Sequence, residues 1–68
     1  MKYTKEEIDS IADKIVEMLT EKEEMRLGKI AKVFIHSGQV KSSYEVEKIL
    51  KYRKDLFVSP KMGVWKLV

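Results

Sequence analysis

The stretch SSYEVEKILKYRKDLFVSPKMGVWKLV, residues 42–68, predicts a helix that runs directly into a β-hairpin. Its start matches a capping box, in which the Ser42 hydroxyl and the Glu45 carboxylate each accept a hydrogen bond from a free backbone N–H. Two sets of residues then recur at helical spacing on opposite sides of the helix. The first set is Val46, Ile49, Leu50 and Arg53, and the second is Tyr44, Glu47, Lys48 and Lys51. We therefore expect a helix over residues 43–54 with one buried face and one exposed, mainly basic face.

The end of the chain has the pattern of two strands joined by a turn. Residues 56–58 and 64–68 are rich in β-branched and aromatic side chains, and residues 59–63, Ser-Pro-Lys-Met-Gly, have turn chemistry. Alternation directs Phe57, Trp65 and Leu67 towards a core and Lys66 outward. We expect Trp65 to anchor that core rather than to bind a ligand. Met62 lies at the predicted tip, where an apolar side chain either marks a contact or has no role.

The size and composition of the chain set limits on its class. With 68 residues there is room for one domain, residues 1–68, which buries only about 60% of the surface that its unfolded chain exposes. Cysteine is absent, so disulfides and thiolate metal sites cannot supplement the core. The sequence contains no apolar run of about 20 residues and no signal-peptide pattern. We expect a cytoplasmic protein with no membrane contact.

Charge is divided unevenly along the chain. Residues 1–24 contain four lysines and eight acidic residues, a net of −4, and residues 25–68 contain ten basic and three acidic residues, a net of +7. Together they give the overall charge of +3. The basic part predicts a polyanion or an acidic protein surface as partner, with the acidic part facing away from it. The alternative is that the lysines simply solvate a small surface.

The first part of the chain predicts an amphipathic helix over residues 5–19 or a little beyond. Thr4 and Glu7 match a capping box, and acidic residues in the first turn suit the helix dipole. The positions at helical spacing on the buried side are Ile8, Ile11, Ala12, Ile15, Val16, Met18 and Leu19, and those outside are Glu6, Asp9, Asp13 and Glu17. We expect this helix to be structural, because its acidic outer face would repel nucleic acid.

The middle of the chain is less regular at first. Residues 20–24 are a charged connector, or the start of another helix, because Thr20 and Glu23 also match a capping box. Residues 25–27 alternate and could form a short strand that pairs with the hairpin. Gly28 then lies at the entry of the next helix or in the turn before it.

A second helix is expected over residues 28–36. Leu27, Ile30, Ala31, Val33 and Phe34 group on one side, and Lys29, Lys32 and His36 group on the other. Gly38 ends the helix, since glycine readily takes the left-handed conformation of a C-terminal cap. Val40 is expected to turn inward. Two short helices joined by a tight turn with glycine have the layout of a helix-turn-helix.

The order helix, short strand, helix, glycine turn, capped helix and hairpin resembles the winged helix-turn-helix superfamily over nearly the whole chain. The residues Ile30-Ala31, Gly38, Leu56-Phe57-Val58 and Gly63-Val64-Trp65 resemble the pattern of HARE-type winged helices. Those domains occur in bacterial RNA polymerase delta subunits and in accessory domains of DNA-acting enzymes. The resemblance implies an α+β fold with three helices and a C-terminal β-hairpin.

The resemblance also implies a function, binding of double-stranded DNA in a transcription-regulatory or accessory role. The helix over residues 43–54 would enter the major groove, where Tyr44, Lys48 and Lys51 would face base edges or phosphates. Lys29 and Lys32 would contact a flanking backbone, and Lys61 in the turn of the hairpin would contact the adjacent phosphate or the minor groove. The candidate nucleic-acid-binding residues are Lys29, Lys32, Lys41, Ser42, Ser43, Tyr44, Lys48, Lys51 and Lys61. Because they include no arginine, we expect backbone-directed, salt-sensitive binding, and a location at the nucleoid.

Other classes of function remain open to different degrees. The same fold could dock its basic face on an acidic surface of a polymerase or another protein, and a homodimer through the first helix is conceivable. Catalysis is not expected, and neither is a cofactor or a metal. His36 is the only histidine, and the sequence around Gly28 lacks the spacing of a phosphate-binding loop.

Overall fold

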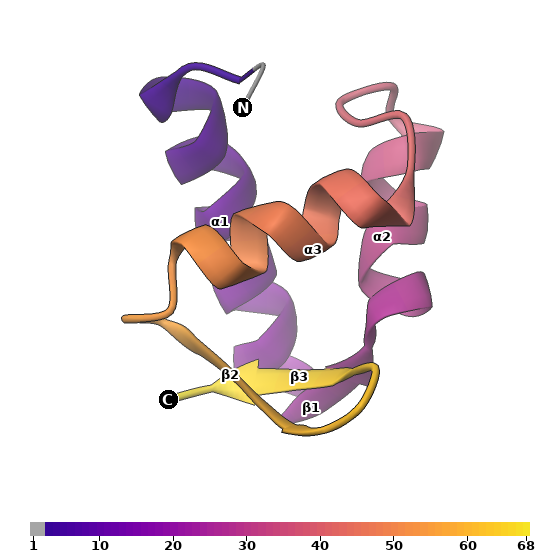
Figure 1. Cartoon of the computed structure of the whole chain (residues 1–68). Helices are drawn as coiled ribbons and strands as arrows, with labels where there is room; N and C mark the ends of the chain where they lie inside the picture. The colour runs from indigo at the N-terminus through magenta and orange to yellow at the C-terminus, as the bar shows by residue number, and fades with distance from the viewer. Residues whose placement is uncertain (1–2) are drawn as a thin grey trace.

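The computed structural model describes residues 3–68, which form three helices and a three-stranded antiparallel sheet. The elements follow in the order α1 (Lys5–Lys22), β1 (Glu24–Arg26), α2 (Leu27–His36), α3 (Ser43–Tyr52), β2 (Phe57–Lys61) and β3 (Val64–Leu67). In Figure 1, α3 crosses in front of α1, and the sheet lies below the helices. This is the α+β class that the sequence predicts, and the arrangement is compatible with a winged-helix fold.

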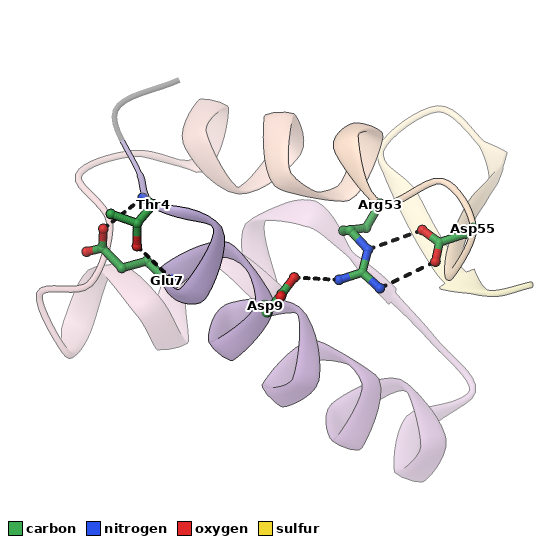
Figure 2. A network of polar contacts seen from close by, with 5 residues as sticks. All are labelled: Thr4, Glu7, Asp9, Arg53 and Asp55. Atoms are coloured by element: carbon green, nitrogen blue, oxygen red, sulfur yellow. Dashed lines mark hydrogen bonds and ion pairs between the residues drawn. The ribbon is translucent and has the colours of Figure 1, made fainter.

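α1 begins at the predicted cap. The Thr4 hydroxyl accepts from the Glu7 backbone N–H at 3.1 Å, and the Glu7 carboxylate accepts from the Thr4 N–H at 2.9 Å (Figure 2). Both bonds of the capping box are therefore formed, and they satisfy two backbone donors that a helix start leaves without partners.

α1 ends later than the sequence suggests. It continues past Leu19 to Lys22, so residues 20–22 belong to it rather than to a connector. Thr20 lies inside the helix, where its hydroxyl donates to the Val16 carbonyl at 2.7 Å. The alternative that Thr20 starts a new helix is therefore wrong. The chain leaves the helix at Glu23, which has a φ of 69°.

The helices and the sheet share one hydrophobic core. Its largest fully buried side chains are Ile15, Leu19, Ile30, Phe34, Val46, Ile49, Leu50 and Phe57. Burial of one such aliphatic side chain contributes about 1.5–3 kcal/mol, so this core is the main source of stability in a chain without disulfides. Within residues 3–68 no polar or charged residue is buried, and none of the helices is long and apolar enough to cross a bilayer.

Val33 departs from the expected core. The sequence predicts it on the buried side of α2, yet it is 42% exposed. It borders a depression whose α1 wall is polar and includes Ser10, Asp13 and Glu17, so no apolar surface of α1 covers it. Periodicity within α2 defines an apolar stripe, but the neighbouring helix decides which edge of that stripe is buried.

The turn after α2 forms as expected, and Gly28 lies within the first turn of that helix. Gly38 has a φ of 81°, a left-handed conformation that glycine adopts readily. The next two backbone N–H groups, of Gln39 and Val40, both donate to the Phe34 carbonyl and close the end of the helix. Val40 is buried, as the sequence predicts.

α3 begins at Ser43 with Ser42 as its N-cap, as predicted, but its capping bonds and its end differ from the expectation. It ends at Tyr52, slightly earlier than predicted, with Arg53 as its C-cap. At its start the capping box is not formed. The Ser42 hydroxyl makes no capping bond, and the Glu45 carboxylate accepts from the Lys41 backbone N–H at 2.7 Å, one residue before the position that a capping box uses.

The sheet has the order β1-β3-β2, and both strand pairs are antiparallel. β1 is the predicted short strand, one residue earlier than expected, and it places Met25 opposite Trp65. On the other side of β3, Leu67 lies opposite Phe57. Phe57 and Trp65 are buried, Leu67 is half-buried against the core and Lys66 is exposed, so the predicted alternation is confirmed.

β2 is longer than predicted because it contains a β-bulge. Between Val58 and Lys61, two residues of β2 lie opposite one residue of β3. Pro60, which the sequence assigned to the turn, lies in this bulge and in an edge strand, where the missing N–H does not interrupt the ladder. The turn itself is reduced to Met62 and Gly63.

Candidate nucleic-acid interface

The outward face of α3 carries the residues that the sequence predicts there. Tyr44, Lys48 and Lys51 follow one another at intervals of four and three residues, which places them in one stripe, and all are exposed. The Lys48 ammonium lies 5.1 Å from the centre of the Tyr44 ring, so the two side chains form a cation–π contact. Glu47 interrupts the positive charge, since its carboxylate lies 3.9 Å from Lys51 Nζ.

The segment before α3 brings an acid close to the predicted phosphate contacts. Lys41, Ser42 and Ser43 are exposed, as a contact surface requires. The Glu45 carboxylate binds the Lys41 N–H, and it lies in the first turn of the helix, where a phosphate would also be attracted. The Glu45 carboxylate thus places a negative charge beside the start of the helix, and we expect the serines to contribute less than the lysines.

The same carboxylate ties the N-terminal segment to α3. The Tyr3 hydroxyl donates to Glu45 Oε1 at 2.5 Å, across 42 positions of the chain. This hydrogen bond, with smaller effects of burial and of the charges of Glu45 and Glu7, raises the pKa of Tyr3 to about 12. No local pattern in the sequence indicates this contact, because it joins residues far apart in the chain.

Arg53 fixes the other end of α3. Its guanidinium donates to Asp9 of α1 at 2.8 Å and to both carboxylate oxygens of Asp55 at 3.2 and 3.3 Å (Figure 2). The hydrogen bond from Arg53 holds the pKa of Asp55 below its usual value. Arg53 is thus engaged with two carboxylates, and its role is to hold α3 on α1 rather than to extend the basic stripe.

A second basic group lies on the outer face of the sheet. Lys61 and Arg26 both lie opposite Val64, one on each side of it, so their side chains point to the same face of the sheet. Lys66 lies on that face as well, since it is two residues along β3 from Val64, and so does Glu24, which lies opposite Lys66. Val64 is 7% exposed yet does not belong to the core cluster, which agrees with its position on the outer face under the neighbouring side chains.

Two of these residues were missed by the sequence analysis. Arg26 and Lys66 do not appear among the predicted contacts, although the predicted strand at residues 25–27 already contained the necessary signal. Once Met25 faces the core, Arg26 must face outward. The register between β1 and β3 then brings it beside Lys61, and only the sheet order reveals that neighbour.

The predicted lysines of α2 lie on a different helix from the α3 stripe. Lys29 and Lys32 are exposed. Lys29 lies one turn before Val33, which borders the depression next to α1, so Lys29 lies towards the α1 side of α2. The start of α2 is also joined to the hairpin, because the Leu27 N–H donates to the Gly63 carbonyl at 2.8 Å. The structure thus brings the start of α2 close to the turn between β2 and β3, and it keeps Tyr44, Lys48 and Lys51 together on α3.

The described part of the chain offers little for other chemistries. Within residues 3–68 no three histidine, aspartate or glutamate side chains gather in a group that could hold a metal ion. His36 is exposed at the end of α2. Comparison with known protein families, with curated proteins and with solved structures gave no significant match.

Proposed function

We propose that this chain is a winged-helix domain that binds double-stranded DNA, mainly through the phosphate backbone. α3 faces the major groove, and the turn between β2 and β3 contacts the flanking backbone. The proposal includes a transcription-regulatory or accessory role and a location with DNA in the cytoplasm. It is supported by the order of the elements and by the placement of basic residues on their exposed surfaces.

The observation that carries the proposal is the exposed stripe of Tyr44, Lys48 and Lys51 on α3. A helix that carries lysines on its exposed side fits a groove lined by phosphates, and the major groove is wide enough to admit one helix. The tyrosine adds an amphipathic ring that can contact sugar or base edges. The acidic residues lie mainly on α1, which α3 crosses on the side turned to the viewer in Figure 1.

The chemistry of the stripe favours binding with low sequence preference. Lysine is a flexible point charge, and specific reading of guanine is usually made by the planar fork of arginine. If about four phosphates are neutralised, the logarithm of the affinity should fall with the logarithm of the salt concentration at a slope of about −3.6. The ion pair between Glu47 and Lys51 reduces the free charge, so we expect modest affinity.

The test is a titration of the labelled protein with a random-sequence duplex, followed by NMR and by fluorescence anisotropy. The double variant Lys48→Glu, Lys51→Glu should abolish binding. Its matched control is Lys14→Glu, Lys22→Glu, which makes the same change of charge on exposed residues of α1. The control should bind nearly as the unmodified chain does, because nonspecific loss of positive charge would affect both variants alike.

Two results would contradict the proposal. One is equal weakening by the two double variants, which would mean that net charge alone attracts the duplex. The other is absence of any shift with duplex, together with a salt-insensitive complex with an acidic protein. The second result would favour the protein-docking function, for which the alternating acids and bases of α3 are also suited.

A further inference from the structure

Two of the three tyrosines of the chain are exposed on α3. Tyr44 and Tyr52 are each 61% exposed, and neither hydroxyl has a hydrogen-bond partner within residues 3–68. Tyr3, in contrast, is half-buried, and its hydroxyl donates to Glu45. An aromatic ring left in water adds little to the stability of the fold, and tyrosine is enriched where proteins bind other molecules. The two rings on α3 are therefore candidates for contact with a partner.

Tyr52 continues the stripe of Tyr44 and Lys48. The interval is four residues from Tyr44 to Lys48 and four more to Tyr52, so the three side chains follow one another along one side of the helix. The two tyrosines are separated by about 12 Å along the helix axis, with Lys48 midway between them. α3 crosses in front of α1 in Figure 1, and the stripe lies on the side of α3 opposite its buried residues.

Cations lie close to both rings. The Lys48 ammonium lies 5.1 Å from the centre of the Tyr44 ring and occupies one of its two faces. Two residues after Tyr52, Lys54 is exposed and makes no ion pair within residues 3–68. Aromatic rings set among cations fit a strand of unpaired nucleotides, because the bases stack on the rings while the phosphates are attracted to the lysines. In a duplex the faces of the bases are covered by the neighbouring base pairs, so they cannot stack on a side chain without being unstacked.

We propose that α3 also binds single-stranded DNA, with one base stacked on Tyr44, a second base stacked on Tyr52, and Lys48 in contact with a phosphate between them. Stacked bases of one strand are about 3.4 Å apart, so the separation of the two tyrosines corresponds to about three base steps. Every base has an aromatic face, so this contact has little sequence preference. The inference uses the surface of the proposed duplex binding, but it does not depend on that binding.

The experiment measures the anisotropy of three fluorescein-labelled ligands. They are a short oligothymidylate, an abasic strand of the same length, and a random-sequence duplex. The abasic strand keeps the phosphates but has no bases, so it separates stacking from attraction by charge. The unmodified protein should bind the oligothymidylate about fivefold or more tighter than the abasic strand. In NMR spectra, the ring resonances of Tyr44 and Tyr52 should shift with the oligothymidylate and not with the abasic strand.

Tyr52 is the residue to change, because it lies outside the set of side chains proposed to contact the duplex. Tyr52→Ala should bind the oligothymidylate about fivefold or more weakly and should bind the duplex with nearly unchanged affinity. Tyr52→Phe keeps the ring and should retain binding of the oligothymidylate. The matched control is Ile35→Ala, which removes a 42% exposed apolar side chain from α2 and should leave all three affinities unchanged. Thermal melting should show that all three variants are folded, since both side chains are exposed.

The outcomes separate this inference from the proposed function. Equal affinity for the oligothymidylate and the abasic strand, or equal weakening of single-strand and duplex binding in Tyr52→Ala, overturns the stacking contact and leaves the proposed duplex binding intact. Preference for the oligothymidylate together with absence of duplex binding supports the stacking contact and overturns the proposed function. Absence of binding to all three ligands overturns both. Loss of single-strand binding in Tyr52→Ala, with retention in Tyr52→Phe, supports the inference.

Discussion

At the residue scale, Arg53 links three segments through two carboxylates. It contacts Asp9 on α1 and Asp55 in the loop after α3, and it is itself the C-cap of α3. The pKa of Asp55 is lowered in the folded state, mainly by the hydrogen bond from Arg53. A lowered folded-state pKa means that Asp55 stabilises the fold above its unfolded value of 3.8, and that this contribution is lost as the pH falls through the folded-state pKa.

We therefore predict that part of the acid sensitivity of the fold comes from this pair. Asp55→Asn should melt at a lower temperature than the unmodified chain at neutral pH, and its melting temperature should fall less steeply between about pH 5 and pH 2. Circular dichroism melts across this range measure both effects. Glu21→Gln, which removes an exposed acid on α1, is the control and should keep the acid dependence of the unmodified chain. Parallel curves for the unmodified chain and Asp55→Asn would contradict the prediction.

At the element scale, two helix starts with the same sequence signature behave differently. Thr4 and Glu7 form both bonds of the capping box, whereas the Ser42 hydroxyl forms no capping bond. Loss of a working cap costs about 1 kcal/mol. Thr4→Ala should therefore lower the free energy of unfolding by about that amount, and Ser42→Ala should change it by no more than a few tenths of a kcal/mol.

Chemical denaturation of the two variants tests this difference, because both substitutions remove an exposed hydroxyl at an N-cap position, although Thr4→Ala also removes a methyl group. Equal losses would mean that Ser42 does cap α3 in solution. Unchanged slopes of free energy against denaturant would show that the comparison concerns the folded state.

The contrast between these two caps shows that local sequence patterns predict which elements form but not every contact at their ends. Periodicity and the glycine turn were enough to predict α1, α2, α3 and the hairpin, since these signals are local. The start of α3 at Ser43 is as predicted, but the capping box at Ser42 is not formed, because Glu45 accepts hydrogen bonds from Lys41 and from Tyr3, which is 42 positions away. Pro60 was assigned to the turn because proline is typical of turns, whereas an edge strand with a bulge accepts it equally well.

At the scale of the whole molecule, the position of one surface relative to another cannot be predicted from the sequence. Exposure of the predicted contact residues could be predicted, because each lies opposite an apolar stripe. The neighbours of Lys61 could not be predicted, because only the strand order β1-β3-β2 places Arg26 and Lys61 on either side of the same β3 residue. The exposure of Val33 likewise depends on the polar side of α1 that lies across the depression from it.

The separation of charge across the molecule leads to a prediction about salt. Glu17 and Glu21 are exposed on α1, while Glu47 lies on α3 with its carboxylate 3.9 Å from Lys51 Nζ. At about 0.15 M salt the Debye length is about 8 Å, well below the smallest dimension of the domain, 20 Å. We therefore expect Glu17 and Glu21 to be screened from a duplex bound at α3, and Glu47 not to be.

Glu47→Gln should accordingly tighten duplex binding at about 0.15 M and at about 0.01 M salt, because it removes a negative charge from the proposed interface and frees Lys51. The double variant Glu17→Gln, Glu21→Gln should tighten binding only at the lower concentration, where the Debye length of about 30 Å exceeds the size of the domain. Anisotropy titrations at the two salt concentrations measure both effects. A gain at the higher salt from the α1 variant, with none from Glu47→Gln, would mean that the duplex lies against α1 and that α3 faces away from it.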